Sequence, residues 1–334
     1  MRTSNPSVSV VLPAYNAAEY IKSAVVSILN QTYKDIELIV INDGSTDETL
    51  QILLGLQKLD SRLLIISREN RGLVRSLNEG MAAARGAWIA RMDADDISKP
   101  NRIQKQITYA EEQKLDICGA YVRTFGFCRP NIRKYPVTSA GANLQLAFNT
   151  CFAHPTIIGR AEVLKENPYS ERFDKIEDYE LWTRLAVKGF RLGNVPEVLL
   201  HYRRTFSQAT SVHRSIQDEM RIAIAMNYVK YTATMLPSDV LLALLSRSSR
   251  IDDDTVTRAA YKLHELIVAG HDIEDVLAHN LKLFLMHNCT TLGSESWGYL
   301  KALLPARSLL SIGAMRGAGF HPGHKLWNFL YLLK

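Results

Sequence analysis

The sequence predicts an α/β fold in which a doubly wound, mostly parallel sheet is followed by a helical C-terminal region. Between Ser7 and Met92, strand-like apolar runs alternate four times with helical patterns, and the joins between them are short. Such alternation is typical of a parallel sheet with right-handed crossovers. From about Ser211, helical spacing replaces the strand patterns. In a chain of 334 residues we therefore expect two units, residues 1–210 and 211–334.

Apolar periodicity, with Gly and Pro as breaks, places the elements of the first unit. The expected strands are residues 7–12, 36–41, 63–67, 87–92, 116–125, 149–160 and 195–202. The expected helices are residues 17–31, 47–59, 73–84, 100–114, 161–166 and 176–188. Asn16 and Glu19 have the spacing of a capping box, which predicts the start of the first helix. Residues 126–150, interrupted by prolines, are predicted to form an irregular, mobile loop over the functional site.

Three carboxylates follow the predicted strand 87–92, in the run Met92-Asp93-Ala94-Asp95-Asp96. Carboxylates this close repel one another unless a cation balances them, and Mg²⁺ or Mn²⁺ prefers oxygen ligands of this kind. The run stands at the carboxyl edge of the sheet, where open α/β folds bind their ligands. The alternative is a solvated acidic turn before the helix that starts near Pro100.

A second polar motif, Asn42-Asp43-Gly44-Ser45, directly follows the predicted strand 36–41. A single carboxylate there can accept a hydrogen bond from the N3–H of uracil, and Gly44 allows the backbone to come close. Taken alone, the motif is also a common turn. Its place on the same sheet as the acidic run favours a nucleotide site.

Composition and missing motifs exclude several functional classes. Hydrophobic residues make up 47% and charged residues 22% of the chain, which is ordinary for a globular protein. The net charge of +6 indicates an anionic partner, whether nucleic acid, a phospholipid surface or a phosphorylated substrate. The four cysteines and nine histidines lack zinc-site spacing. Neither G-x-G-x-x-G after the first strand nor a P-loop sequence occurs, which argues against dinucleotide dehydrogenases and P-loop NTPases.

Five ordered motifs together resemble the family 2 glycosyltransferases with the GT-A fold. They are Val11-Leu12-Pro13-Ala14-Tyr15-Asn16, Asn42-Asp43-Gly44-Ser45-Thr46-Asp47, residues 70–86, Met92-Asp93-Ala94-Asp95-Asp96 and Glu177-Asp178-Tyr179-Glu180-Leu181-Trp182. The resemblance covers residues 7–205. It implies an inverting enzyme that uses a UDP-sugar donor and Mn²⁺ or Mg²⁺. The implied acceptor is a hydroxyl of a glycan or lipid-linked molecule, in the synthesis of cell-surface polysaccharide or lipopolysaccharide.

The resemblance also assigns donor-binding residues by position. Pro13, Tyr15 and Asp43 would hold the base, with Asp43 on uracil. Arg75 would lie near the diphosphate or the base. Asp93 would contact the ribose or another part of the donor.

For the reaction itself, the resemblance implies that Asp95 ligates the metal and that Asp178 is the catalytic base. A metal on Asp95 would stabilise the charge of the departing UDP. Asp178 begins a predicted helix, whose dipole favours its ionised form, and would take the proton of the acceptor hydroxyl. In the alternative, Glu177 and Asp178 only stabilise the first turn of that helix.

Three residues are candidates for the acceptor side: Glu177, Trp182 and His154. Trp182 lies one helical turn after Asp178 and could stack on an acceptor sugar, with core packing as its alternative role. His154 precedes Pro155 and either lines the acceptor side or is structural.

One motif departs from the family pattern. After its last strand the family often has Y-R-x-H, in which the histidine completes the metal or diphosphate site. This chain has Tyr202-Arg203-Arg204-Thr205 instead. We expect that His201, or Arg203 with Arg204, takes over the diphosphate contacts, or that the metal keeps an extra water.

The residues after Glu295 are basic, aromatic and leucine-rich, and include no acid. This composition is typical of a helix on an anionic membrane surface, and a basic helical subdomain packed on the sheet would share it. The N-terminus has no apolar signal segment. We therefore expect a cytoplasmic protein whose C-terminal region is a candidate for peripheral binding to the inner face of the plasma membrane.

Two other functions fit the sequence less well than a glycosyltransferase. A sugar-phosphate nucleotidyltransferase has a related sheet, but it should carry a Gly-rich basic loop where this chain has Pro13-Ala14-Tyr15-Asn16. A nucleic-acid binder is suggested only by the pI of about 9.0, and the acidic edge of the sheet argues against it. We therefore expect no nucleic-acid partner.

Overall fold

The computed structural model describes residues 6–205 and 214–232. The chain divides into two compact units, residues 1–142 with 150–217 and residues 143–149 with 218–334. The predicted division at residue 210 stays a prediction, because most of the second unit lies outside the described residues. Helical spacing also predicts helices at 239–246, 252–269 and 273–286, and these lie outside the described residues, as does the basic aromatic segment.

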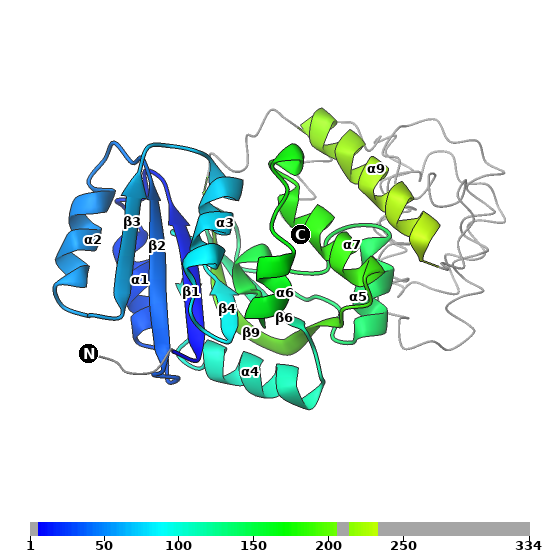
Figure 1. Ribbon diagram of the computed structural model, residues 1–334, viewed down its shortest axis with the longest axis horizontal. Coiled ribbons are helices and arrows are strands. Elements are labelled where there is room, and N and C mark those ends of the chain that lie inside the picture. Colours follow the sequence, from blue (N-terminus) through cyan, green and yellow to red (C-terminus); the bar gives the residue numbers. More distant parts are fainter. Residues whose placement is uncertain (1–5, 206–213, 233–334) are drawn as a thin grey trace. The chain divides into compact units, whose positions relative to one another are not determined.

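The first unit is built on one sheet with the strand order β3-β2-β1-β4-β8-β6-β9-β5, and β7 pairs with β6. Figure 1 shows β3, β2, β1 and β4 side by side in that order. The strands are β1 (Val8–Ala14), β2 (Ile36–Asp43), β3 (Leu63–Arg68), β4 (Trp88–Arg91), β5 (Ile97–Ser98), β6 (Ile117–Gly126), β7 (Ile132–Arg133), β8 (Ile158–Arg160) and β9 (Leu192–Arg204). The ladders that join β3, β2, β1 and β4 are parallel, and β8 runs antiparallel to β4 and β6. The α/β class with a mostly parallel sheet is confirmed.

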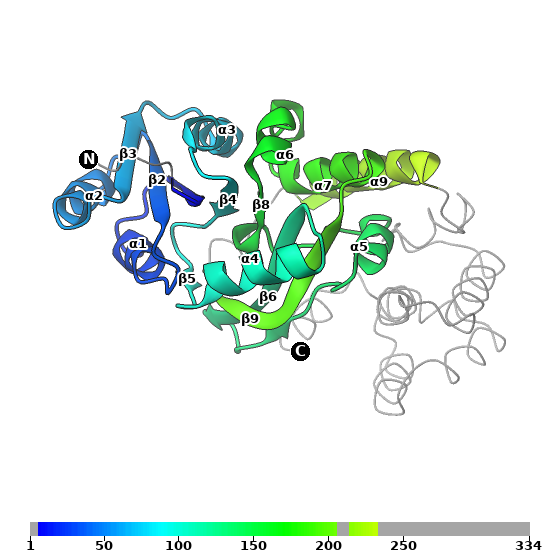
Figure 2. The ribbon, with the colours of Figure 1, turned by 60° about the horizontal axis from the view of Figure 1, so that its bottom comes forward.

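Helices of the first unit cover both faces of this sheet. The helices of that unit are α1 (Ile21–Leu29), α2 (Thr49–Gln57), α3 (Leu73–Ala83), α4 (Arg102–Glu112), α6 (Ala161–Glu166) and α7 (Glu177–Val187), with 3₁₀ turns η1 (His154–Thr156) and η2 (Glu171–Phe173). Two more helices, α5 (Ser139–Leu146) and α9 (Arg214–Tyr231), reach into the second unit. In Figure 2, α1 and α4 lie on one face and α3 and α6 on the other. Ile28 of α1 and Ile103 of α4 join aliphatic side chains of β1 and β2 in the core.

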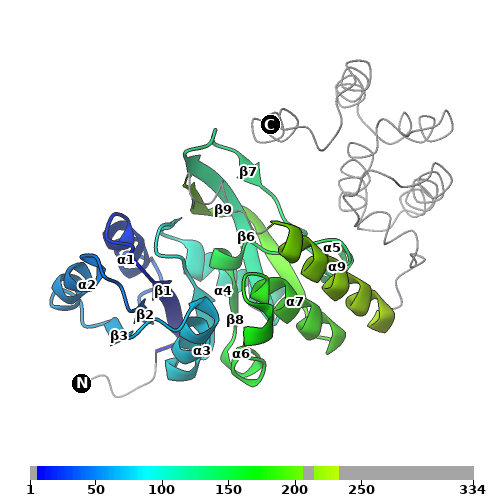
Figure 3. The same cartoon turned by 90° about the horizontal axis from the view of Figure 1, so that it is seen from above.

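The strands that carry the functional motifs begin where the sequence predicts them. β1 to β4 each start within one residue of the expected position. Their β-branched residues suit a strand buried on both faces, and every residue of β1 and β2 is buried. Further along the sheet, β6 and β9 run side by side over their length (Figure 3). Because β3, β2, β1 and β4 are parallel neighbours, their carboxyl ends form one continuous edge of the sheet.

The predicted capping box at Asn16 and Glu19 is wrong. α1 begins only at Ile21, and Asn16 has a left-handed φ of 47°. The Asn16 side chain instead accepts a hydrogen bond from the Thr46 N–H at 2.8 Å. The backbone N–H groups before α1 are satisfied by side chains from the β2–α2 loop, since that of Ala17 donates to Thr49 Oγ1 at 2.8 Å. A contact between distant segments therefore replaces the local cap.

Two further expectations are corrected between residues 126 and 160. The stretch 126–150 is not irregular throughout, because it contains β7 and α5, whose Ala142 and Leu146 are fully buried. The expected strand 149–160 is reduced to its last three residues, β8. Before it, the chain makes the 3₁₀ turn η1, where Pro155 fixes φ and lacks the N–H that a ladder needs.

α9 lies where helical spacing predicts a helix, although most of the helical region falls outside the described residues. Among the described helices, none combines the length and apolarity that crossing a bilayer requires.

The packing of α3 on β1 can be tested at a glycine. A Cβ added to Gly80 would lie 2.3 Å from Val11 Cγ1, whereas one added to Gly55 of α2 would meet nothing within 4 Å. Gly80→Ala should lower the free energy of unfolding by about 1–3 kcal/mol because it overpacks the core. Gly55→Ala should raise it by up to about 1 kcal/mol, because alanine favours the helix. Urea unfolding followed by circular dichroism measures both, and similar effects at the two sites would contradict the close packing.

Candidate functional site

The carboxyl ends of β1, β2 and β4 bring the predicted motifs to one edge of the sheet. Tyr15 follows β1, Asp43 ends β2, and the acidic run of residues 93–96 follows β4. These strands are parallel neighbours, so their ends point the same way. The sequence-based expectation of one shared edge is met for these three motifs.

Asp93, Asp95 and Asp96 form a compact acidic cluster. One carboxylate oxygen from each lies within 4.8 Å of the other two. Asp96 is fully buried, and its Oδ1 accepts a hydrogen bond from the Arg203 N–H at 2.7 Å. Burial and the nearby Asp93 raise the pKa of Asp95 to about 6, and the same two causes raise that of Asp96 to about 9. The surroundings therefore disfavour the charged forms of Asp95 and Asp96.

A buried arginine balances part of the negative charge of the acidic cluster. Arg91, at the end of β4, is 5% exposed and contacts both oxygens of Asp93, at 2.5 and 2.9 Å. Beneath it, the fully buried Arg102 of α4 donates to the Arg91 carbonyl at 2.7 Å. Burial lowers the pKa of Arg102 to about 9. Sequence reasoning missed both arginines, because an arginine next to a strand looks like a surface residue until the fold buries it.

The acidic cluster fits a hard divalent cation. All of its candidate ligand atoms are carboxylate oxygens, which Mg²⁺ and Mn²⁺ prefer. Asp96 Oδ2 is buried and has no hydrogen-bond partner among the described residues. Asp95 was the predicted ligand, and the structure adds Asp96 to the candidates because its carboxylate joins the same cluster.

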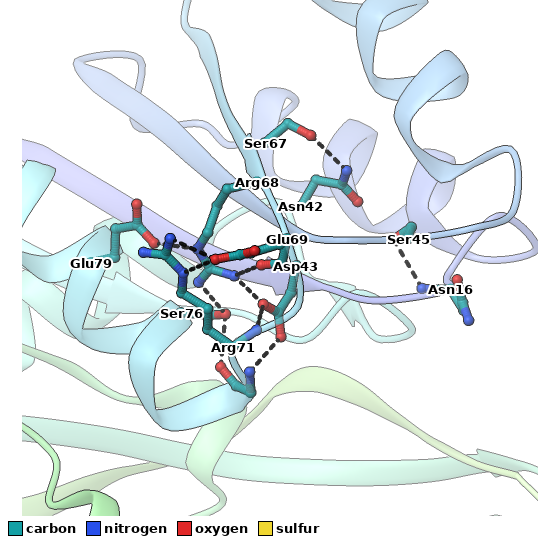
Figure 4. Close-up of polar contacts among 11 residues, drawn as sticks. Asn16, Asn42, Asp43, Ser45, Ser67, Arg68, Glu69, Arg71, Ser76 and Glu79 are labelled. Carbon is teal, nitrogen blue, oxygen red and sulfur yellow. Dashed lines mark hydrogen bonds and ion pairs between the residues drawn. The ribbon is translucent and has the colours of Figure 1, made fainter.

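Asp43 lies at the same edge but is held by the protein itself (Figure 4). It is 4% exposed, and its Oδ1 pairs with the Arg68 guanidinium and accepts the Arg71 N–H at 2.8 Å. Its Oδ2 accepts the Gly72 N–H at 3.0 Å. Asp43 therefore fixes the loop that leads into α3, in addition to any contact with a base.

Arg68 is fully engaged around Asp43. Its Nε donates to Glu79 at 2.7 Å and a terminal nitrogen donates to Ser76 Oγ at 3.0 Å (Figure 4). Close packing continues at Gly44, whose φ is 71° and where a Cβ would lie 2.5 Å from the backbone N of Asn70. The glycine predicted to allow close approach thus meets a neighbouring loop of the protein.

The other predicted donor residues differ in exposure. Pro13 is buried within β1, where it pairs with Ile41 of β2. Tyr15 is 54% exposed at the sheet edge. Arg75 projects from α3 and pairs with Glu171 at 3.0 Å, and this contact raises its pKa. Their roles in donor binding stay predictions.

Glu177 and Asp178 begin α7 in different surroundings. Glu177 is 4% exposed, and burial with the adjacent Asp178 raises its pKa to about 7. Asp178 is half-buried and accepts a hydrogen bond from the Tyr179 N–H at 2.7 Å. Burial also raises the pKa of Asp178, so it opposes the helix dipole that was expected to favour the ionised form.

His154, and Trp182 of α7, belong to one cluster of aromatic side chains. Trp182 is fully buried, and its ring meets that of Phe152 edge to face at 5.2 Å. His154 Nε2 lies 2.8 Å from the Tyr169 hydroxyl, and its Nδ1 lies 3.8 Å from Glu177. Burial, with a smaller contribution from Arg91, holds the pKa of His154 well below its usual value. These contacts match the structural alternatives considered for both residues.

The segment that departs from the family motif ends β9. His201 pairs with Ile97 of β5, its ring meets Phe125 edge to face, and burial lowers its pKa. Arg203, rather than His201, reaches the acidic cluster, since its main chain contacts Asp96. Thr205 is the last described residue of this segment.

Comparison with known proteins gives the family. The profile described as Glycosyl transferase family 2 matches residues 9–167. A protein of Haemophilus influenzae named as an uncharacterized glycosyltransferase is 36% identical over 254 residues, which span 70% of this chain and 77% of that protein. This chain belongs to glycosyltransferase family 2. The family predicted from the five motifs is thus confirmed.

Other relatives of this glycosyltransferase agree in fold. The O-antigen biosynthesis glycosyltransferase WbnJ of Escherichia coli is 37% identical over 202 residues, spanning 59% of this chain and 79% of WbnJ. TarS of S. aureus, solved with UDP-GlcNAc, superposes with a TM-score of 0.59 at 17% identity, over 94% and 92% of the two chains. A Pyrobaculum calidifontis mannosyltransferase solved with GDP-Man and Mn²⁺ has a TM-score of 0.53 at 18% identity, over 99% and 86%. The GT-A fold is confirmed.

The Asp43–Arg68 pair should support stability apart from any ligand. Asp43→Asn should lower the free energy of unfolding by about 2–4 kcal/mol, because it removes the more buried of the two carboxylates that pair with the Arg68 guanidinium. Glu197→Gln is the control, because it breaks an exposed ion pair with Lys105. The Glu197 side chain is 51% exposed and the Lys105 side chain 38%, and such surface pairs contribute less than about 1 kcal/mol. Urea unfolding compares the two. Equal losses of unfolding free energy in the two variants would show that the buried pair stabilises the protein no more than the exposed one.

The raised pKa of Glu177 predicts that the stability of the folded protein depends on pH. Its pKa is about 7 in the folded protein, against an ordinary value of 4.5. From pH 4.5 to 7 the folded state therefore holds a proton that the unfolded state has lost, so this group's contribution to stability falls as pH rises. Glu177→Gln stays neutral, and its Tm relative to wild type should rise between pH 5 and pH 8. Thermal unfolding curves that keep a constant offset across that range would refute the shift.

Proposed function

We propose that this family 2 glycosyltransferase transfers a sugar from a UDP-sugar to a hydroxyl of a glycan or lipid-linked acceptor, with inversion at the anomeric carbon. The observation that carries the proposal is the acidic cluster of Asp93, Asp95 and Asp96 at the carboxyl edge of the sheet, one strand end away from Tyr15. A nucleotide diphosphate with a divalent cation matches both the place and the charge of that cluster.

UDP is the proposed donor nucleotide. Asp43 at the end of β2 offers carboxylate oxygens to the uracil N3–H, and the exposed Tyr15 ring offers a surface beside it. Pro13, Arg75 and Asp93 complete the proposed donor contacts, with Asp93 on the ribose. Support comes from TarS, which was solved with UDP and with UDP-GlcNAc. The mannosyltransferase was solved with GDP-Man, so a GDP-sugar is the alternative donor to test against a UDP-sugar.

Mn²⁺ or Mg²⁺ is the proposed cofactor, held by Asp95 with help from Asp96 or Asp93. When bound, such an ion supplies positive charge that stabilises the diphosphate leaving group. Arg91 keeps Asp93 oriented through its two contacts, so the cluster needs little rearrangement before the donor binds.

Asp178 is the proposed catalytic base. The acceptor hydroxyl gives its proton to the Asp178 carboxylate while its oxygen bonds to the anomeric carbon. The bond from that carbon to the diphosphate oxygen breaks, and its electron pair leaves with UDP. A raised pKa makes the Asp178 carboxylate a stronger base at neutral pH. One base on the face opposite the leaving group gives inversion.

The proposed acceptor belongs to cell-surface polysaccharide synthesis, at the inner face of the plasma membrane. The name of WbnJ, an O-antigen biosynthesis glycosyltransferase, supports this assignment. The C-terminal segment proposed to contact the membrane lies outside the described residues. A sugar-phosphate nucleotidyltransferase is not favoured, because both the sequence profile and the named relatives are glycosyltransferases.

The proposal predicts metal-dependent UDP release. UDP-, GDP- and dTDP-sugars, each with and without Mn²⁺, are incubated with the full chain and candidate acceptors, and the released nucleotide is measured. Release should be fastest with one UDP-sugar and Mn²⁺. Asp95→Asn and Asp178→Asn should each lower kcat by about 100-fold or more, because one loses a metal ligand and the other the base.

Glu197→Gln is the control for these variants, since Glu197 pairs with Lys105 and contacts none of the proposed site. It should keep wild-type turnover. Full turnover by both Asp95→Asn and Asp178→Asn would remove the residue assignments, and pyrophosphate release from a nucleoside triphosphate would revive the nucleotidyltransferase. The anomeric configuration of the product, read by NMR, tests inversion.

A further inference from the structure

Arg203, near the end of β9, contacts two consecutive residues of the acidic cluster. Its backbone N–H donates to Asp96 Oδ1 at 2.7 Å. Its side-chain Nε–H donates to the backbone carbonyl of Asp95 at 2.8 Å. The contact with Asp95 is therefore to the main chain rather than to its carboxylate.

The Arg203 guanidinium is itself held by two aromatic rings. Its central carbon lies 4.2 Å from the centroid of Tyr20 and 4.4 Å from that of Phe125. Tyr20 immediately precedes α1, and Phe125 belongs to β6. Cations over aromatic faces at such distances are attracted to them. Three separate segments thus fix the orientation of one side chain.

The contacts on either side of Asp95 show what Arg203 adds. Before it, the Arg91 carbonyl is held by Arg102. After it, Ile97 and Ser98 pair with His201 and Leu200 of β9. Between these anchors, the Arg203 side chain holds the Asp95 carbonyl.

We propose that Arg203 is a positioning residue that orients the Asp95 carboxylate for the divalent cation, rather than a direct ligand of the donor diphosphate. The inference rests on the metal site of the proposed function. A diphosphate ligand needs its guanidinium fork turned to the substrate, whereas this guanidinium has its Nε committed and its faces stacked. Lysine cannot replace it, because an ammonium has neither the planar face nor the fixed Nε–H.

The variants separate positioning from general packing. Arg203→Met and Arg203→Lys remove the contact with the Asp95 carbonyl, and Phe125→Leu removes one face of the stack while keeping the arginine. Arg160→Met is the matched control, because Arg160 lies 4.9 Å over the Trp88 ring and 3.8 Å from Asp116 but is not part of the acidic cluster.

The first measurement is hydrogen exchange on the full chain without metal. The peptide that covers residues 93–98 should exchange about tenfold faster or more in Arg203→Met and Arg203→Lys than in wild type. Phe125→Leu should show a smaller increase, and Arg160→Met should exchange like wild type in that peptide. Unchanged exchange in both Arg203 variants would overturn the inference.

The second measurement is a titration with Mn²⁺ alone, followed by UDP at saturating Mn²⁺. Both Arg203 variants should bind Mn²⁺ about tenfold more weakly or worse, since partners that orient metal ligands typically have effects of that size. Wild-type Mn²⁺ affinity with weakened UDP binding would overturn the inference in favour of a direct diphosphate ligand. If wild type itself binds no Mn²⁺, the metal site of the proposed function fails, and the exchange result alone decides whether Arg203 holds the Asp95 segment.

Discussion

The rest of the structure depends on how negative charge is balanced at one edge of the sheet. Asp93, Asp95 and Asp96 share a small volume there, and Glu177 and Asp178 are acids that burial also affects. Ionised groups removed from water are unfavourable unless they are paired. Arg91 provides two contacts to Asp93, while the pKa values of Asp95 and Asp96 stay raised. The fold thus neutralises part of the charge and leaves a remainder that a proton or a cation can balance.

Asp43 shows the opposite solution at the same edge. Its two oxygens accept hydrogen bonds from Arg68 and from two backbone N–H groups, so its charge is answered within the protein. The acidic cluster is suited to binding a cation that comes and goes, whereas Asp43 is suited to holding a loop in one shape. The combination of a fixed loop and an unbalanced cluster suits a ligand with a base at one end and a metal-bound diphosphate at the other.

The sequence could predict the strands and the motifs that follow them, because β-branched runs and turn residues act locally and parallel strands share an edge. It could not predict contacts that depend on the whole fold. Asn16 looked like a helix cap, but the N–H groups before α1 donate instead to distant side chains, among them that of Ala17 to Thr49. Arg203 reaches Asp95 across 108 residues. Nothing local in Arg-Arg-Thr distinguishes a stacked guanidinium from a surface cation, so the sequence left Arg203, together with Arg204, as one of three alternatives for completing the diphosphate or metal site.

The hydrogen bonds that Asp43 accepts from the N–H groups of Arg71 and Gly72 have one more consequence, because Gly72 is the N-cap residue of α3. The amino end of a helix carries partial positive charge, and many nucleotide-binding proteins use it to attract phosphate. Here an internal anion already sits against that end of α3. Asp43 thus offsets the partial positive charge that the start of α3 would otherwise present to a phosphate.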